Sequence, residues 1–446
     1  MKKLSAILFA VLLLVAFPLL AQGATRTIAQ TPMTLVKTLS PSEQTTGMLV
    51  RGRIIYLIGT VTGVVSTDGF IQALDSTGTV LWSLPLDNGA NEIATAATFD
   101  SSGNIWVVGS AQRPQPSPSA TPTPTASATP TPTASATPTP TPTASATPTP
   151  TPTTSATPSA SATPTVLNPD GVIVEPSIPM RPDLTYLSLW KVSSRGALLG
   201  SYMYDMKSAF LVRGAAVVNN ALAVVGLIPT ASGHAGLLMR SDLNGNFTKP
   251  ILIGKTDTEL NAVVKRRDGS LVLLGSSSEK IAKQSRKGNK DGIVVVVTPL
   301  GKISSLVRSS NISSTRSWQS GTNSFFFGGD SIGKAKSEAV VTKFGSTLLP
   351  SWTMRFASLG PAIVADGPTS HFFALSTVGA VAGVRGWKPS KPSVLVLGLD
   401  PKGVLKGAYG ASAMTTPLAV GYSRDLGLVV LGRGSAGVSV FHAVPR

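Results

Sequence analysis

Three features of the sequence predict an all-β fold: the form of its apolar runs, the repetition of its turns and the lack of a helical period. The apolar runs are four to eight residues long, rich in Val, Ile, Leu and aromatic residues, and bounded by Gly, Asn, Asp or Ser, as in NIWVVG (104–109) and SLVLLG (270–275). Beyond the N-terminal segment, no stretch shows the spacing of an amphipathic helix. With 42% hydrophobic and 13% charged residues, most of the chain can form a core.

The N-terminal segment predicts export. Lys2 and Lys3 precede an apolar run over residues 4–20, and the small-residue pattern AQGA (21–24) follows. We expect a signal peptide over residues 1–23, cleaved near Gly23 or Ala24, and an extracellular or cell-surface location. The alternative is a retained anchor, for which the run is short and interrupted by Pro18. No later run is long enough to span a membrane.

The sequence contains no cysteine. This excludes disulfides, lipoprotein attachment, thiol catalysis and thiolate metal sites. The stability of an exported chain of this composition must then come from a large buried core.

Two classes of tight turn alternate along the chain, with Gly or Asn placed where a positive φ is needed. The first class precedes the apolar runs, at Gly52, Gly103, Asn220, Gly269, residues 321–324, Gly367 and Gly427. The second class follows a later strand, at Gly78, Gly196, Gly245, Gly301, Gly345 and Gly403. From a second-class turn to the next first-class turn the interval stays between 22 residues (Gly345 to Gly367) and 25 residues (Gly78 to Gly103), whereas the other interval varies widely.

This alternation predicts a β-propeller of four-stranded blades. With strands lettered A to D from the axis outward, the first turn class joins A to B and the second joins C to D. The constant interval is then strand D, a crossover and the next strand A. The first-class turns indicate seven blades, with six or eight left open because the unit at residues 321–324 is degenerate. The segment MTLVKTLS (33–40) would close the ring by supplying strand D of blade seven.

Residues 114–180 form a Thr/Pro/Ser-rich insert in which TASATPTPTP recurs. Such composition cannot form a core and predicts an extended, disordered spacer, either an O-glycosylated stalk or an unmodified linker. The segment before it (31–113) supplies a closing strand, blade one and half of blade two, and the segment after it (181–446) supplies the rest. Because each side lacks two strands of blade two, we expect one propeller rather than two small domains.

The repeats resemble those of secreted bacterial β-propellers of the SBBP type. The resemblance is carried by GNIWVVGSAQ (103–112), by TYLSLWKVSSRGALLGSYMYD (185–205) and by residues 269–306. In addition, ALDSTGTVLWSLPL (73–86) is similar to a quinoprotein-type repeat. The resemblance covers most of residues 45–446 and implies the fold; such families have no single activity, so it implies little about function.

No catalytic, cofactor or metal constellation is evident. His234, His371 and His442 lie in different blades without metal-ligand spacing, and each is expected to be isolated. The aspartates lie mostly in turns, where they hydrogen-bond the backbone. The expected inner strands, such as NAVVK and TAATF, are small and apolar. We therefore predict no catalytic residue, no cofactor and no metal, and keep a lyase or a quinone-dependent oxidoreductase with a site at the central mouth as the alternative.

Long basic loops between strands B and C are the strongest candidate for a binding surface, because long loops on a rigid scaffold collect binding residues. Those of blades four, five and six lie around residues 276–292, at 334–336 and at 377–393. The candidate residues for an anionic ligand are Lys280, Lys283, Arg286, Lys287, Lys290, Lys334, Lys336, Arg385, Trp387, Lys388 and Lys391, with Trp387 as the one exposed aromatic residue.

The formal net charge of +17 agrees with an anionic partner, although it can equally serve solubility. We expect a non-enzymatic, monomeric binding module that meets an anionic cell-wall polymer, a glycan or a protein partner. Nucleic acid is not expected. A purely structural spacer at the cell surface is the remaining alternative.

Overall fold

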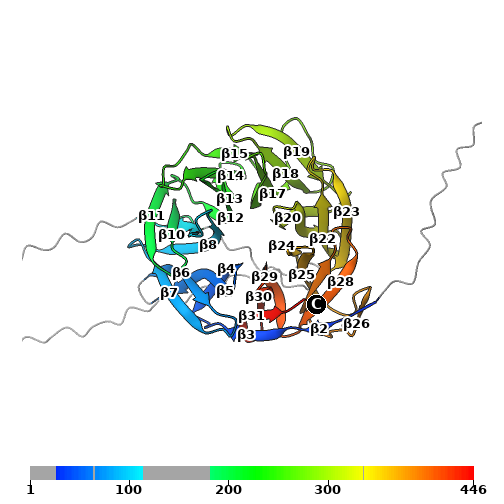
Figure 1. Cartoon of the computed structure of the whole chain (residues 1–446). Coiled ribbons are helices and arrows are strands. Elements are labelled where there is room, and N and C mark those ends of the chain that lie inside the picture. The colour runs from blue at the N-terminus through cyan, green and yellow to red at the C-terminus, as the bar shows by residue number, and fades with distance from the viewer. Residues whose placement is uncertain (1–26, 64–65, 114–180, 335, 446) are drawn as a thin grey trace, which may run out of the picture. The chain divides into compact units, whose positions relative to one another are not determined.

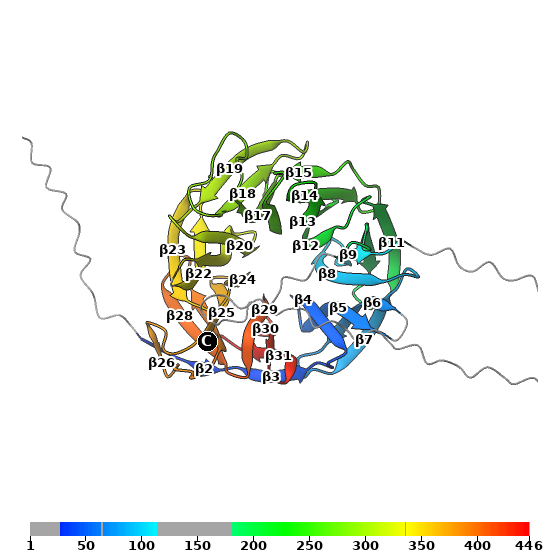
Figure 2. The same cartoon turned by 180° about the vertical axis from the view of Figure 1, so that it is seen from behind.

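Seven four-stranded antiparallel units surround a common axis in the computed structural model, which describes residues 27–63, 66–113, 181–334 and 336–445 (Figures 1 and 2). The prediction of an all-β propeller with seven blades is confirmed. The predicted signal peptide (1–23) and the predicted insert (114–180) lie outside the described residues. Among the described residues, no helix is long and apolar enough to cross a membrane.

Each blade is built in sequence order from the axis outward. Blade one consists of β4 (Glu43–Arg51), β5 (Ile54–Thr62), β6 (Thr67–Leu74) and β7 (Val80–Leu86). Blade two consists of β8 (Glu92–Phe99), β9 (Ile105–Ala111), β10 (Tyr186–Val192) and β11 (Leu198–Asp205). Blade three consists of β12 (Leu211–Val218), β13 (Ala221–Thr230), β14 (Gly233–Asp242) and β15 (Ile251–Ile253). Blades four and five consist of β16 (Thr258–Lys265), β17 (Leu271–Ser277), β18 (Asp291–Val297) and β19 (Ile303–Ser309); and β20 (Thr315–Gly321), β21 (Phe326–Ile332), β22 (Ser337–Phe344) and β23 (Pro350–Ala357).

Blades six and seven are completed by the N-terminal segment. Blade six consists of β24 (Ile363–Asp366), β25 (His371–Thr377), β27 (Ser393–Leu399) and β28 (Leu405–Ala411), and blade seven of β29 (Met414–Ser423), β30 (Gly427–Gly434) and β31 (Gly437–Ala443). The predicted closing strand is β3 (Thr34–Thr38), which pairs antiparallel with β31. Before it, β2 (Thr31–Pro32) pairs parallel with β28, and β1 (Ile28–Ala29) pairs parallel with β26 (Val384–Arg385). The sequence did not predict these two contacts: β2 makes blade six five-stranded, and β1 and β26 form a separate two-stranded sheet.

The strands on either side of the insert lie in one sheet. Strand β9 pairs with β10 in continuous register, from Ile105 opposite Val192 to Ala111 opposite Tyr186. The chain therefore leaves blade two between its second and third strands and returns to the same position. Loops between the second and third strands of every blade open on one face, which we call the B–C face; the A–B turns open on the opposite A–B face.

Most of the repeated turns place a glycine or asparagine at a positive φ, but the turns of blade five use other residues. Gly103 and Gly269 have φ values of 86° and 80°, as predicted. In blade five the equivalent position is held by Phe325 with φ 63°, and the later turn of the same blade uses Leu348 with φ 60° where Gly345 was expected to serve. Gly367 was also expected at a positive φ, but it begins a longer turn in which its N–H bonds to Ser370.

Every innermost strand except β24 carries a one-residue β-bulge opposite a glycine of the second strand, and β29 carries two. In blade four the register shifts between Leu260 and Ala262, so Asn261 is the extra residue and Leu260 faces Gly275. The side chain of Asn261 then donates a hydrogen bond of 3.0 Å to the carbonyl of Trp318 in the next blade. The bulge thus links neighbouring blades around the axis.

The core lies between adjacent blades. Apolar side chains of each blade pack against those of the next, and Trp106, Trp190 and Trp318 are fully buried there, as the sequence indicated for most tryptophans.

Candidate functional site

The predicted basic residues lie in the loops of three consecutive blades on the B–C face. These loops join β17 to β18, β21 to β22 and β25 to β27. Nine of the eleven candidate side chains are exposed: Lys280, Lys283, Arg286, Lys287, Lys334, Lys336, Arg385, Lys388 and Lys391. Trp387 and Lys290 are not, and each has a different role from the one predicted.

The two acidic residues of the blade-four loop are held by hydrogen bonds and an ion pair within the protein. Glu279 accepts hydrogen bonds from the backbone N–H groups of Lys255 and Thr256 and from the Thr258 hydroxyl. Burial opposes ionisation of Glu279, but these hydrogen bonds outweigh it and lower its pKa. Asp291 is fully buried and pairs with Arg308 at 3.3 Å. The loop therefore presents its lysines without a competing exposed carboxylate.

Trp387 anchors the blade-six loop instead of serving as an exposed aromatic ligand contact. Its side chain is buried, and its Nε1–H donates a 2.9 Å hydrogen bond to the hydroxyl of Thr377. The indole packs against Gly410, beside Gln30 of the N-terminal segment. Its prediction as an exposed residue was wrong because the segment that covers it comes from the other end of the chain. The anchored loop holds Arg385 and Lys388 in an ordered position.

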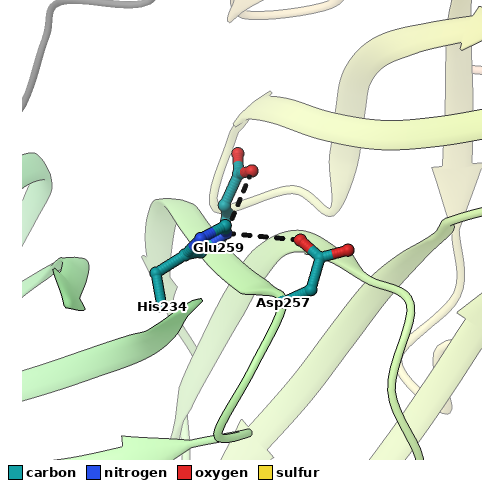
Figure 3. Close-up of side chains that lie close together, drawn as sticks. All are labelled: His234, Asp257 and Glu259. Carbon is teal, nitrogen blue, oxygen red and sulfur yellow. Dashed lines mark ion pairs between the residues drawn. The ribbon is translucent and has the colours of Figure 1, made fainter. Parts of the chain in front are cut away.

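Lys290 belongs to a charged cluster rather than to the exposed surface. Its Nζ lies 2.7 Å from Asp257 and 2.8 Å from Glu259. The Nε2 atom of His234 lies 3.3 Å and 3.4 Å from the same two carboxylates (Figure 3). Burial would lower the pKa of Lys290, but the two carboxylates outweigh it and raise the pKa, so the amine stays protonated. His234 is therefore not isolated, contrary to the expectation from sequence.

Further charges lie on inner strands of the neighbouring blades. Arg213 and Arg316 are on β12 and β20, and burial lowers the pKa of Arg316 to about 10. Burial raises the pKa of Asp330 on β21 to about 6. The inner strands of blades three to five are thus more polar than the expected small apolar ones. Arg213 and Asn261 are the extra residues of the β-bulges in β12 and β16, which only the structure reveals.

A cleft on the A–B face was missed by the sequence reasoning. It has a volume of about 750 Å³ and is lined by Lys265, Arg266 and Arg267 of blade four together with Phe325 and Lys343 of blade five. A neighbouring hollow of about 570 Å³ shares Lys265 and Arg266. The run KRR (265–267) directly before an A–B turn was the available signal.

No protein-family model and no curated protein sequence matches this chain. Among solved structures, it is similar to the Pan2 WD40 domain of Neurospora crassa, with a TM-score of 0.49 and 10% identity over 94% of this chain and 96% of that one. It is also similar to the β-propeller domain of the Trilobed protease from Pyrococcus furiosus (TM-score 0.44, 8% identity, 91% and 94% covered). A third is Sqt1 of Chaetomium thermophilum, bound to the N-terminus of a ribosomal protein (TM-score 0.44, 12% identity, 94% and 100% covered). Similarity at these identities concerns the fold alone.

Proposed function

We propose that the chain is an exported, non-enzymatic binding propeller whose basic loops on the B–C face contact an anionic polymer at the cell surface. The observation that carries the proposal is the set of nine exposed cationic side chains on the loops of blades four to six. Each exposed cation contributes little alone, but a polymer with repeated carboxylates or phosphates meets many of them at once.

The loops suit this role because they are ordered before binding. Trp387 fixes the loop of blade six, and Glu279 and Asp291 fix the loop of blade four. An ordered loop loses less conformational entropy when it binds, so more of the electrostatic attraction remains as affinity. The same arrangement gives a strong dependence on salt, because exposed charges are screened.

The test is retention of the mature full-length chain on immobilised polygalacturonate along a salt gradient, with neutral dextran as the blank matrix. A variant with Lys280→Glu and Lys283→Glu should elute at clearly lower salt. The matched control carries Lys265→Glu and Arg267→Glu, which changes the net charge equally on the A–B face and should elute close to the unmodified chain.

Two outcomes would overturn the proposal. Equal losses in both variants would show that retention follows net charge rather than the basic loops. A loss in the control variant alone would move the binding surface to the A–B face. If the unmodified chain is not retained on polygalacturonate at any salt concentration, the alternative of a purely structural spacer is favoured.

The His234 cluster favours a second candidate, a lyase-type enzyme at the mouth of the B–C face. The imidazole of His234 lies 3.3 Å from one carboxylate and 3.4 Å from another, and such carboxylates orient a histidine that acts as a general base. The amine of Lys290 would offset negative charge that develops on a substrate carboxylate. In such an elimination, His234 takes the proton next to that carboxylate and an oxygen leaving group departs, giving an unsaturated product.

The enzyme hypothesis is tested by following the ultraviolet absorbance of the unsaturated product when the protein is mixed with polygalacturonate. Product formation that disappears in His234→Gln, with polymer retention intact, would replace the non-enzymatic proposal. Retention without any product at high protein concentration would support a binding module.

A further inference from the structure

Three acidic side chains meet between blades one and two on the B–C face. Asp68 lies at the start of β6, Asp87 directly follows β7, and Glu92 begins β8. A carboxylate oxygen of each lies within 4.8 Å of those of the other two. The connection from Asp87 to Glu92 is a short turn in which Gly89 has φ 81° and donates its N–H to Asp87 at 2.6 Å.

Two buried carboxylate oxygens of this group have no hydrogen-bond partner. Glu92 is completely buried; its Oε1 accepts the Asn88 N–H at 3.1 Å, while its Oε2 has no partner. Asp68 likewise accepts from the Ser66 hydroxyl at 3.1 Å through Oδ2, while its Oδ1 is buried without a partner. A buried carboxylate oxygen without a partner is costly, and such groups commonly mark the place of an ion or water.

Within the described residues, no positive side chain pairs with these carboxylates. Among the ion pairs found in the described part of the chain, none involves Asp68, Asp87 or Glu92. In the cluster of Asp257 and Glu259, by contrast, the amine of Lys290 already lies between the carboxylates. The first group has three carboxylates and no paired amine among the described residues, whereas the second has two carboxylates, a histidine and the amine of Lys290.

We propose that Asp68, Asp87 and Glu92 bind a calcium ion. The donors are all oxygen atoms, which calcium and magnesium prefer over the nitrogen and sulfur ligands of zinc. Calcium accepts irregular sets of six to eight oxygens and completes them with water, whereas magnesium requires near-octahedral geometry. Two strand starts and a turn give an irregular arrangement, which favours calcium. Sites in extracellular modules have Kd values of about 10⁻⁴ to 10⁻³ M, and we expect this range.

The bound ion would stabilise the place where the chain leaves the propeller for the insert. The side chain of Asn91 accepts the Thr67 N–H at 2.8 Å and donates to Gln112 at 2.7 Å, and Gln112 follows the last residue of β9. Calcium on Asp68 and Glu92 would therefore tie β6, the turn before β8 and the end of β9 together. The site requires neither the basic loops nor the polymer.

The test is isothermal titration calorimetry of the chelator-treated, mature full-length chain with calcium chloride, together with thermal unfolding in EDTA and in 10 mM calcium. The expected result is saturable binding of one ion and a rise of about 2 °C or more in Tm. Magnesium should bind at least tenfold more weakly, and sodium chloride of equal ionic strength should not reproduce the rise.

Variants assign the effect to the site. Glu92→Gln and Asp68→Asn should abolish the calcium response, and Glu92→Gln should be at least as stable as the unmodified chain in EDTA because it removes a buried charge beside two like charges. The control is Asp257→Asn, which should keep the full response. If a buried variant fails to fold, the exposed Asp87→Asn carries the test, with at least a tenfold weaker Kd. Absence of calcium binding, or binding that persists in all three site variants, would overturn the proposal.

Discussion

An alanine Cβ at position 275 would lie 1.8 Å from the carbonyl oxygen of Glu259. No side chain can approach a backbone oxygen that closely, so Gly275 is required by the bulged inner strand that it faces. The same relationship recurs between Gly109 and Ile93 at 1.9 Å and between Gly226 and Leu211 at 2.0 Å. In every blade except blade six, a glycine near the end of the apolar run is therefore the partner of an inner-strand bulge.

Replacing this glycine should open the inner strand. We expect Gly275→Ala to lower the free energy of unfolding by about 3 kcal/mol or more, because backbone must move to admit the methyl group. Urea denaturation measures the change. The control is Gly360→Ala, where a Cβ meets nothing within 4 Å and φ is not in the left-handed region; its effect should stay below about 1 kcal/mol. Equal effects of the two substitutions would refute the explanation.

The fold was predictable because its signals are local. Apolar runs that end in glycine and turns with Gly or Asn repeat at steady intervals, and each can be recognised without knowledge of distant contacts. Blade six shows the limit of this reasoning: Leu375 holds the place of the recurrent glycine, and its inner strand β24 has no bulge. Blade five looked degenerate because Phe325 takes the positive-φ turn position that glycine or asparagine holds in most other blades.

The candidate site was less predictable because burial of loop residues is decided by distant segments. Trp387 reads as exposed in its own loop, yet the N-terminal segment at Gln30 covers it. In the sequence, Lys290 is one of five cations of the blade-four loop, but in the structure its amine donates hydrogen bonds to Asp257 and Glu259 at the start of blade four. His234 and Asp257 come together as a parallel bridge between two blades, which no spacing rule in the sequence indicates.

Removal of the closing strand should destabilise the whole ring. A chain that begins at Glu43 lacks β3, which pairs with β31, and loses the burial of Met33 and Leu39. Loss of about 200 Å² of buried apolar surface would cost roughly 5 kcal/mol. Thermal unfolding and size-exclusion chromatography should show a lower Tm and association through the exposed edge of β31. A chain that begins at Thr34 keeps β3 and should remain monomeric; if it associates equally, closure by β3 is not the cause.

The Thr/Pro/Ser-rich insert should be dispensable for folding. Ala111 and Tyr186 are paired residues of adjacent strands, which lie about 4.8 Å apart, so a short Gly/Ser linker in place of residues 114–180 can connect them. We expect a single thermal transition with Tm within about 2 °C of the unmodified chain. Residues 31–113 and 181–446 expressed separately should not fold alone, because each lacks two strands of blade two. Independent cooperative unfolding of either fragment would contradict a single propeller.

Asp330 should make stability fall as the pH rises from about 4 to about 6. Burial raises the pKa of its carboxyl in the folded protein to about 6, above the ordinary value of 3.8, and its Oδ1 has no hydrogen-bond partner. The folded state therefore holds a proton that the unfolded state has lost across this interval, and the contribution of Asp330 is present below it and lost above it. Its neighbours act in opposite directions, since Arg316 lowers the pKa and Glu259 raises it.

The Asp330→Asn side chain cannot ionise, so the stability of this variant relative to the unmodified chain should increase by about 2 kcal/mol between pH 4 and pH 7, as measured by urea denaturation across that range. Asp366 has a lowered pKa and changes stability in the opposite sense, but it is common to both proteins and its effect cancels in the difference. Parallel stability curves for the two proteins would show that the carboxyl of Asp330 reaches solvent and titrates normally.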